Sequence, residues 1–213
     1  MKNLFFVLIA VLLAGPVFGD KVPFTFGIYG GIGVGNYVKE VDGFDPNEEL
    51  TPKDTPLSST FGVRVHYALV DSLDILSGLA YTRRRVIVAS ADKATGNDSW
   101  HMNIARNYLQ IPAMLRWGSN FYLAGGGYLA FQLGDAWSEN QDVALPDSVQ
   151  NKTDYGVMAE IGYRFYDTAS LAVNMEWGFV NVVEYPSTFS MGFIVKNVQL
   201  SLFLAIEFDL LNN

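Results

Sequence analysis

The sequence predicts an all-β fold, an eight-stranded antiparallel up-and-down β-barrel that crosses a membrane. Three observations lead to this prediction. Apolar residues recur at every second position in eight separate runs, the connections between the runs alternate between long and tight, and an apolar segment opens the chain. A period of two is typical of a strand, because successive side chains point to opposite faces.

Composition agrees with a membrane barrel. Only 17% of residues are charged, whereas 50% are hydrophobic and 14% are aromatic, and a soluble domain usually has about a quarter of its residues charged. The chain has no cysteine, which excludes disulfides and thiolate metal sites. Its formal charge of −8 argues against a nucleic-acid partner, because phosphate binding requires clustered Lys and Arg.

Residues 1–19 are predicted to be a secretory signal peptide. Lys2 precedes an apolar segment at residues 4–14, and small residues follow up to Gly19. The apolar segment is too short to span about 30 Å of hydrocarbon as a helix. We therefore expect Sec-type export, cleavage near Gly19/Asp20, and a barrel domain at residues 20–213 located in the outer membrane.

The first three predicted strands cover residues 24–38, 61–69 and 73–88. Each has one apolar face, with Phe24, Phe61 and Leu73 near the starts of these faces. The opposite faces carry glycines and polar side chains, among them Arg64, His66, Asp74, Thr82 and Arg84. Gly30 to Gly35 belong to the first strand and do not form a phosphate-binding loop, because no helix and no Lys-Ser/Thr pair follow.

A central hairpin gives the next two strands, at residues 108–117 and 121–133, around the polar turn 118–120. Its apolar face is clear, and its other face carries Gln110, Arg116, Tyr122 and Tyr128. Pro112 cannot donate a hydrogen bond to a neighbouring strand, so we expect a β-bulge there.

The last three predicted strands cover residues 155–165, 171–179 and 194–210. Their mixed faces carry Glu160, Arg164, Glu176 and Glu207. Long connections are expected at 40–59, 89–104 and 134–153, with a shorter one at 184–191, and tight turns at 70–72, 118–120 and 167–169. Long loops at one end and tight turns at the other are typical of outer-membrane barrels, with the turns in the periplasm.

The apolar face is predicted to contact lipid. The opposite face carries small residues and charges of both signs, which suits the filled interior of a small barrel. The positions expected to face lipid are Leu109, Ile111, Leu115, Leu123, Leu129, Leu202 and Leu204. The aromatic residues expected at the membrane interface are Trp117, Phe121, Phe165 and Phe208.

Several segments resemble a known family. They are Tyr-Leu-Gln-Ile-Pro at 108–112, Tyr-Leu-Ala-Gly-Gly-Gly-Tyr at 122–128, Asp-Tyr-Gly at 154–156 and Asn-Val-Gln-Leu at 197–200. They are similar to the outer-membrane β-barrel domain family that includes PorT-like proteins and small OmpA- or OmpX-like barrels. The resemblance covers nearly the whole mature chain. It implies a Gram-negative outer-membrane barrel, and some relatives assist a secretion machine.

Charged residues of the mixed face are predicted to form a structural ion-pair network. If the 167–169 turn is symmetric about Thr168, Glu160 and Glu176 face each other directly and need a cation, for which Arg64 and Arg164 are the candidates. Arg116, Asp74 and Glu207 complete the predicted network. The alternative is a paired-carboxylate acid/base site, which a side-chain-filled interior disfavours.

No catalytic, cofactor-binding or metal-binding residue is predicted. The two histidines, His66 and His101, lie in no catalytic spacing, and the acidic first loop lacks the spacing of an EF-hand. Arg83 and Arg85 are expected at the outer rim, where they would pair with lipopolysaccharide phosphates.

These expectations favour a monomeric, non-enzymatic outer-membrane barrel that serves envelope structure or loop-mediated surface interaction. Its expected partners are membrane lipid, lipopolysaccharide and a protein bound at the extracellular loops, with no nucleic acid. The alternatives are an accessory component of a secretion or assembly machine, a narrow small-solute channel, a membrane enzyme and a soluble periplasmic ligand-binding barrel.

Overall fold

Eight long strands form the body of the protein. The computed structural model describes residues 24–35, 37–40, 48–51, 56–95, 98–138, 143–144, 147, 150–166, 168–185 and 193–208. The long strands are β1 (Phe24–Val34), β4 (Ser58–Val70), β5 (Leu73–Asp92), β6 (Asp98–Gly118), β7 (Phe121–Gln132), β10 (Thr153–Tyr166), β11 (Ala169–Tyr185) and β12 (Phe193–Phe208). The predicted signal peptide at residues 1–19 lies outside the described residues.

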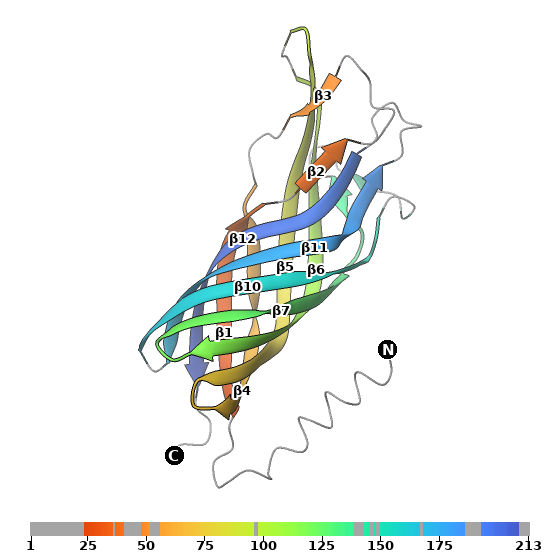
Figure 1. Cartoon of the computed structure of the whole chain (residues 1–213). Helices are drawn as coiled ribbons and strands as arrows, with labels where there is room; N and C mark the ends of the chain where they lie inside the picture. Colours follow the sequence, from red (N-terminus) through yellow and green to blue (C-terminus); the bar gives the residue numbers. More distant parts are fainter. Residues whose placement is uncertain are drawn as a thin grey trace.

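The long strands close into a ring. Each pairs antiparallel with the long strands before and after it, and β1 pairs with β12 to complete the circle. Figure 1 shows the resulting tilted barrel, with its tight turns at the lower end. The predicted eight-stranded up-and-down barrel is therefore confirmed.

Four short strands add to the end opposite the turns. They are β2 (Tyr37–Glu40), β3 (Glu48–Thr51), β8 (Trp137–Ser138) and β9 (Val143–Ala144). β2 pairs with β12, β3 with β5, β8 with β6, and β9 with β8. They extend the β-sheet at this end of the barrel, largely within segments for which the sequence predicted loops.

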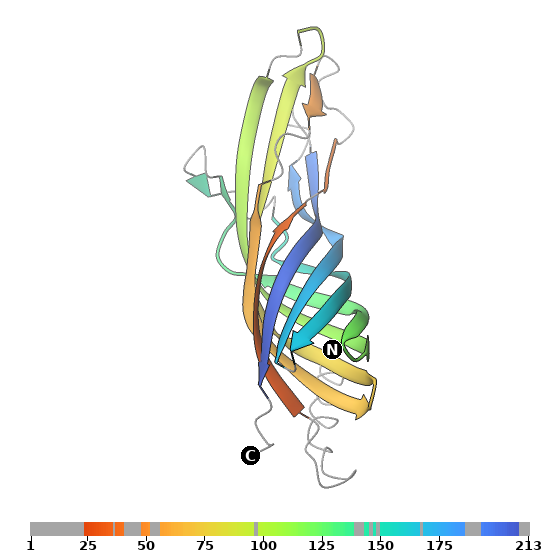
Figure 2. The same ribbon diagram turned by 90° about the vertical axis from the view of Figure 1, so that its left-hand side faces the viewer.

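The expected loop at residues 89–104 is largely a pair of strands. β5 and β6 contain 20 and 21 residues and remain paired to Ala91 and Asp98. Figure 2 shows this hairpin rising well beyond the barrel. The reason is burial: Met102 and Ile104, inside the expected loop, pack against Val86 and Val88 at the end of the predicted third strand, so β6 begins well before the expected position 108.

The β-bulge expected at Pro112 does not occur in the described strands. Pairing of β6 with β7 runs without a shift from Tyr108 to Gly118, and pairing with β5 keeps one register from Ser77–Ala113 to Ala80–Gln110. The hydroxyl of Ser77 donates to the Pro112 carbonyl oxygen at 2.8 Å. β6 therefore tolerates the missing N–H without an extra residue.

Among the described residues, no helix is long and apolar enough to cross a membrane.

Candidate functional site: the polar interior of the barrel

Charged side chains fill the inside of the barrel in three layers. The turn layer, nearest the tight turns, contains Asp74, Arg116, Arg164 and Glu207. The middle layer contains Arg64 and Glu160. The upper layer contains Arg84, Arg106, Asp154 and Glu176. Nearly all are buried, and only Asp74 and Arg164 are partly exposed.

In the turn layer, Glu207 of β12 joins two arginines. It accepts a hydrogen bond from Arg164 at 2.8 Å and one from Arg116 at 3.4 Å. Arg116 also donates its Nε to Asp74 at 2.8 Å, across the β5–β6 pair. His66 Nε2 lies 3.3 Å from Glu207 Oε1 but has no hydrogen-bond geometry to it. A polar cavity of about 270 Å³ opens here between the turns.

In the middle layer, Arg64 of β4 forms a two-bond ion pair with Glu160 of β10. The nitrogen–oxygen distances are 3.0 and 2.8 Å. The Tyr122 hydroxyl donates to Glu160 Oε1 at 3.0 Å. The guanidinium of Arg64 lies 4.2 Å from the centre of the Tyr29 ring, so the cation also has an aromatic partner.

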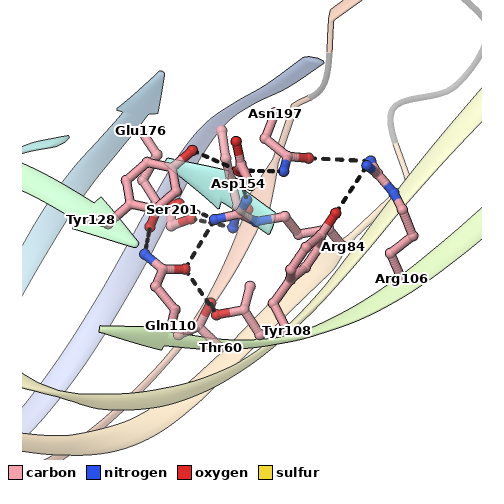
Figure 3. Close-up of polar contacts among 12 residues, drawn as sticks. Thr60, Arg84, Arg106, Tyr108, Gln110, Tyr128, Asp154, Glu176, Asn197 and Ser201 are labelled. Atoms are coloured by element: carbon pink, nitrogen blue, oxygen red, sulfur yellow. Dashed lines mark hydrogen bonds and ion pairs between the residues drawn. The ribbon is translucent and has the colours of Figure 1, made fainter. Parts of the chain in front are cut away.

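The upper layer is built around Arg84, as Figure 3 shows. Arg84 donates to Asp154 at 3.0 Å and forms a short ion pair with Glu176. Gln110 accepts from Arg84 at 2.9 Å and donates to the second Glu176 oxygen at 3.1 Å. The Tyr128 hydroxyl donates to Asp154 at 2.8 Å.

Two arginines of the upper layer face each other on neighbouring strands. Arg84 and Arg106 are direct register partners, an arrangement that is destabilising between like charges. Arg106 donates to Asn197 Oδ1 at 3.2 Å, and Asn197 in turn donates to Asp154 at 2.6 Å. Asn197 thus links the Arg106 charge to the carboxylate that Arg84 also uses (Figure 3).

An apolar cluster, which we call the plug, lies above the upper layer. Its members come from β5, β6, β11, β12 and the segment after β7, and they are Val86, Val88, Met102, Ile104, Ala136, Val182, Val183 and Val195. Each is at most 4% exposed. The plug therefore places an apolar layer between the charged interior and the barrel end opposite the turns.

Each layer is close to electrically neutral among the described residues. The turn and upper layers each combine two arginines with two acids, and the middle layer combines one with one. Buried charges are costly unless paired and hydrogen-bonded. The local balance explains how a small barrel can hold so many ionised groups.

The expected direct pair of Glu160 and Glu176 is wrong. Glu160 is registered with Asn174, and Glu176 with Met158. Tyr166 pairs with Ala169, so the turn is already one residue off symmetry about Thr168, and the register shifts by a second residue between Arg164 and Tyr166. The two carboxylates consequently bind different arginines, Glu160 binding Arg64 and Glu176 binding Arg84. Arg164 lies in the turn layer with Glu207 and does not reach Glu176 in the contacts found.

Sequence reasoning missed the upper layer as a network. The sequence predicted that Arg84 faces inward but gave it no partner in the network. For its neighbours Arg83 and Arg85 it predicted a position at the outer rim. Asp154 and Arg106 lay at or beyond the expected strand ends. Extending the period of two by one or two residues brings Arg106 and Asp154 onto the inward face, where Arg84 and Asn197 already lie within the predicted strands.

The positions expected to face lipid point outward. Leu109 is half-buried, and Ile111, Leu115, Leu123, Leu129, Leu202 and Leu204 are exposed. The aromatic residues Trp117, Phe121, Phe165 and Phe208 are also exposed, near the turn end. A second outward aromatic band, which the sequence did not single out, lies farther from the turns and includes Tyr81, Phe131, Tyr155, Trp177 and Phe179.

The acidic groups of the interior are largely taken up by other side chains. They are engaged by arginines and hydroxyls, and within the described ranges no group of three His, Asp or Glu side chains is placed to hold a metal ion. His101 is exposed on the β5–β6 hairpin, far along β6 from the carboxylates of the interior. The geometry supports a structural role for the network.

Comparisons with known proteins agree with this architecture. The family described as "Outer membrane protein beta-barrel domain" matches residues 20–184. The structure is similar to outer membrane protein OprG from Pseudomonas aeruginosa, at 14% identity and a TM-score of 0.50, covering 86% of this chain and 95% of OprG. No curated protein matches the sequence significantly.

Two further solved structures are similar at lower scores. The attachment invasion locus protein Ail of Yersinia pestis has 14% identity and a TM-score of 0.45, with 86% of this chain and 98% of Ail covered. Outer Membrane Protein W of E. coli has 16% identity and a TM-score of 0.38, with coverages of 86% and 97%.

Proposed function

Because this chain belongs to the outer membrane protein beta-barrel domain family, we propose that it is a sealed, non-enzymatic outer-membrane barrel. Its interior serves to hold the barrel rigid, and its long β5–β6 hairpin serves as a surface for interactions outside the cell. The expected lipid-facing and interfacial residues are part of this proposal.

The observation that carries the proposal is full burial at successive levels of the interior. Arg84, Arg106, Tyr108 and Asn174 are 0% exposed. A water-filled pore would leave the side chains that line it accessible. An eight-stranded barrel has an interior just wide enough for side chains to fill, and the plug adds an apolar barrier above the charged layers. The same burial argues against a small-solute channel and against an internal enzyme site.

Planar-bilayer recording tests the seal. The purified protein, shown to be folded by a gel shift between unboiled and boiled samples, is inserted beside a wide porin that serves as a positive control. We expect no steady conductance from the chain. A reproducible open level in the absence of any substitution would overturn the proposed seal.

The proposed orientation places the tight turns in the periplasm and the β5–β6 hairpin outside. It follows the rule for outer-membrane barrels that long connections face outward. The test is protease treatment of intact cells after a cleavage site is inserted at residues 93–95 or, as its counterpart, at Ser119. Cutting is expected only at 93–95, and cutting at Ser119 alone would reverse the orientation.

We also propose that residues 1–19 are removed on export. N-terminal sequencing of the protein purified from outer membranes is expected to begin at or near Asp20. Retention of Met1 in the membrane-inserted protein would contradict cleavage.

A further inference from the structure

A polar hollow lies on the outer surface where β5, β6 and β8 meet. Its volume is about 570 Å³, and its lining residues are Arg83, Arg85, Ala105, Asn107, Asp135 and Trp137. We call it the rim pocket. Figure 2 shows β8 beside β6 at the base of the β5–β6 hairpin, outside the barrel wall.

The strand register explains the shape of the rim pocket. Arg85, Ala105 and Trp137 are successive register partners on β5, β6 and β8. The small side chain of Ala105 therefore lies between two large ones and leaves a hollow. One row closer to the turns, Arg83 pairs with Asn107, whose Oδ1 accepts a hydrogen bond from the Tyr81 hydroxyl at 2.8 Å.

The rim pocket lies at the height expected for lipid head groups. Trp117 and Asn107 are ten residues apart on β6. At ~3.3 Å per residue and a tilt near ~40°, this separation corresponds to ~25 Å along the membrane normal, about the height of the apolar band of an outer-membrane barrel. Outward residues between these levels are apolar, such as Leu115 and Ile111, and Arg83 lies just beyond Tyr81.

The charge around the rim pocket favours an anion. Arg83 and Arg85 line it together with a single acid, Asp135. Lys152 lies 3.2 Å from Asp135 and 2.8 Å from Asp147. Counting Arg83 and Arg85, the described charged groups at this site are three bases and two acids, which leaves one net positive charge. Hydrogen bonds to Asp147 and Asp135 raise the pKa of Lys152 above its ordinary value.

We propose that the rim pocket binds a phosphate of a phosphorylated glycolipid in the outer leaflet. Two guanidinium groups and the Asn107 amide provide donors that suit phosphate oxygens. The exposed ring of Trp137 suits the interface between sugar and acyl chain. The lipid's acyl chains then lie along the apolar band below. The proposal rests on the proposed orientation, because only that orientation puts Arg83 in the outer leaflet.

Native mass spectrometry of the detergent-solubilised protein tests this site. The probes are lipid A carrying two phosphates, the same lipid without phosphate, and inorganic phosphate. We expect the wild type to retain the phosphorylated lipid at least tenfold more strongly than the dephosphorylated one. Inorganic phosphate at millimolar concentration should not displace it, because it lacks the acyl chains.

Matched variants locate the binding. R83Q/R85Q should lose about tenfold or more in affinity for phosphorylated lipid A. K196Q removes one positive charge from β12, on the opposite side of the ring, and should leave binding unchanged. Equal binding of both lipids, or an R83Q/R85Q variant that binds as the wild type does, would refute the site.

Further measurements distinguish misfolding from loss of the site, and binding of an ion from binding of the lipid. If R83Q/R85Q does not show the gel shift of a folded barrel, the single variants R83Q and N107A are measured instead, with the same expected direction. Displacement by free phosphate alone would show an ion site and overturn the lipid proposal. Conductance of the wild type would refute the proposed seal and leave the lipid result intact.

Discussion

Arg64 and Glu160 join opposite walls of the barrel. They lie on β4 and β10, which are four strands apart in either direction around the ring, and they are connected by two hydrogen bonds of 3.0 and 2.8 Å. Both side chains are 3% exposed or less. Arg84–Glu176 and Arg116–Glu207 join opposite walls in the same way, from β5 to β11 and from β6 to β12.

Glu160→Gln should destabilise the folded barrel by about 3–5 kcal/mol, because it leaves Arg64 buried without its counter-charge. The measurement is the free energy of unfolding from urea titration in lipid vesicles. Glu184→Gln, at an exposed position of β11, is the control and should change it by about 0.5 kcal/mol or less. An unchanged midpoint for Glu160→Gln would show that the pair contributes nothing.

Asn197→Leu should cost about 1–3 kcal/mol, because it removes the acceptor of Arg106 and a donor to Asp154 at once. The same titration should be repeated in an Arg106→Met background, where only the Asp154 contact remains to be lost. We expect a coupling energy of about 1 kcal/mol between the two sites. Strict additivity would mean that Asn197 does not hold Arg106.

Gly126→Ala and Gly125→Ala form a matched pair on β7. A methyl group at Gly126 would lie 2.1 Å from the Ala113 carbonyl oxygen and 2.7 Å from the Met114 Cα, whereas one at Gly125 would meet nothing within 4 Å. Gly126→Ala should lower stability by about 1–3 kcal/mol through overpacking against backbone. Gly125→Ala should be nearly neutral, and the temperature at which the gel shift disappears distinguishes them.

Leu115→Arg should impair membrane insertion, since an arginine on the lipid face costs about 2–4 kcal/mol at the bilayer midplane and less toward the interface, and Leu115 lies two residues inside the level of Trp117. Ser119→Arg introduces the same charge in an exposed turn and should insert normally. The folded fraction in vesicles, read from the gel shift, is the measurement. Equal folding of both variants would argue that Leu115 does not face lipid.

Sequence periodicity located all eight barrel strands because each has one face of a single polarity. It also placed Arg64, Glu160, Arg116 and Glu207 on the inward face. It could not assign partners, since partners come from opposite walls and depend on registers of several strands. A turn one residue off the assumed symmetry and a one-residue shift near Arg164 together separate Glu176 from Glu160, and Glu176 binds Arg84.

The part of the β5–β6 hairpin beyond residue 88 was not predicted, for a different reason. Beyond residue 88, its outward face mixes alanines with polar side chains, so it has no continuous apolar face of the kind that marks the membrane-spanning part. On the inward face only Met102 and Ile104 carry the alternation, and two residues are too few to predict a strand.

The layered interior also bears on how the chain folds. The contacts Arg64–Glu160, Arg84–Glu176 and Arg116–Glu207 join residues 96, 92 and 91 positions apart in the sequence. Such non-local contacts form late, because the loops between them must close first. An open sheet would hold these charges unneutralised, so the last strand, which brings Glu207, makes ring closure and charge neutralisation a single cooperative step.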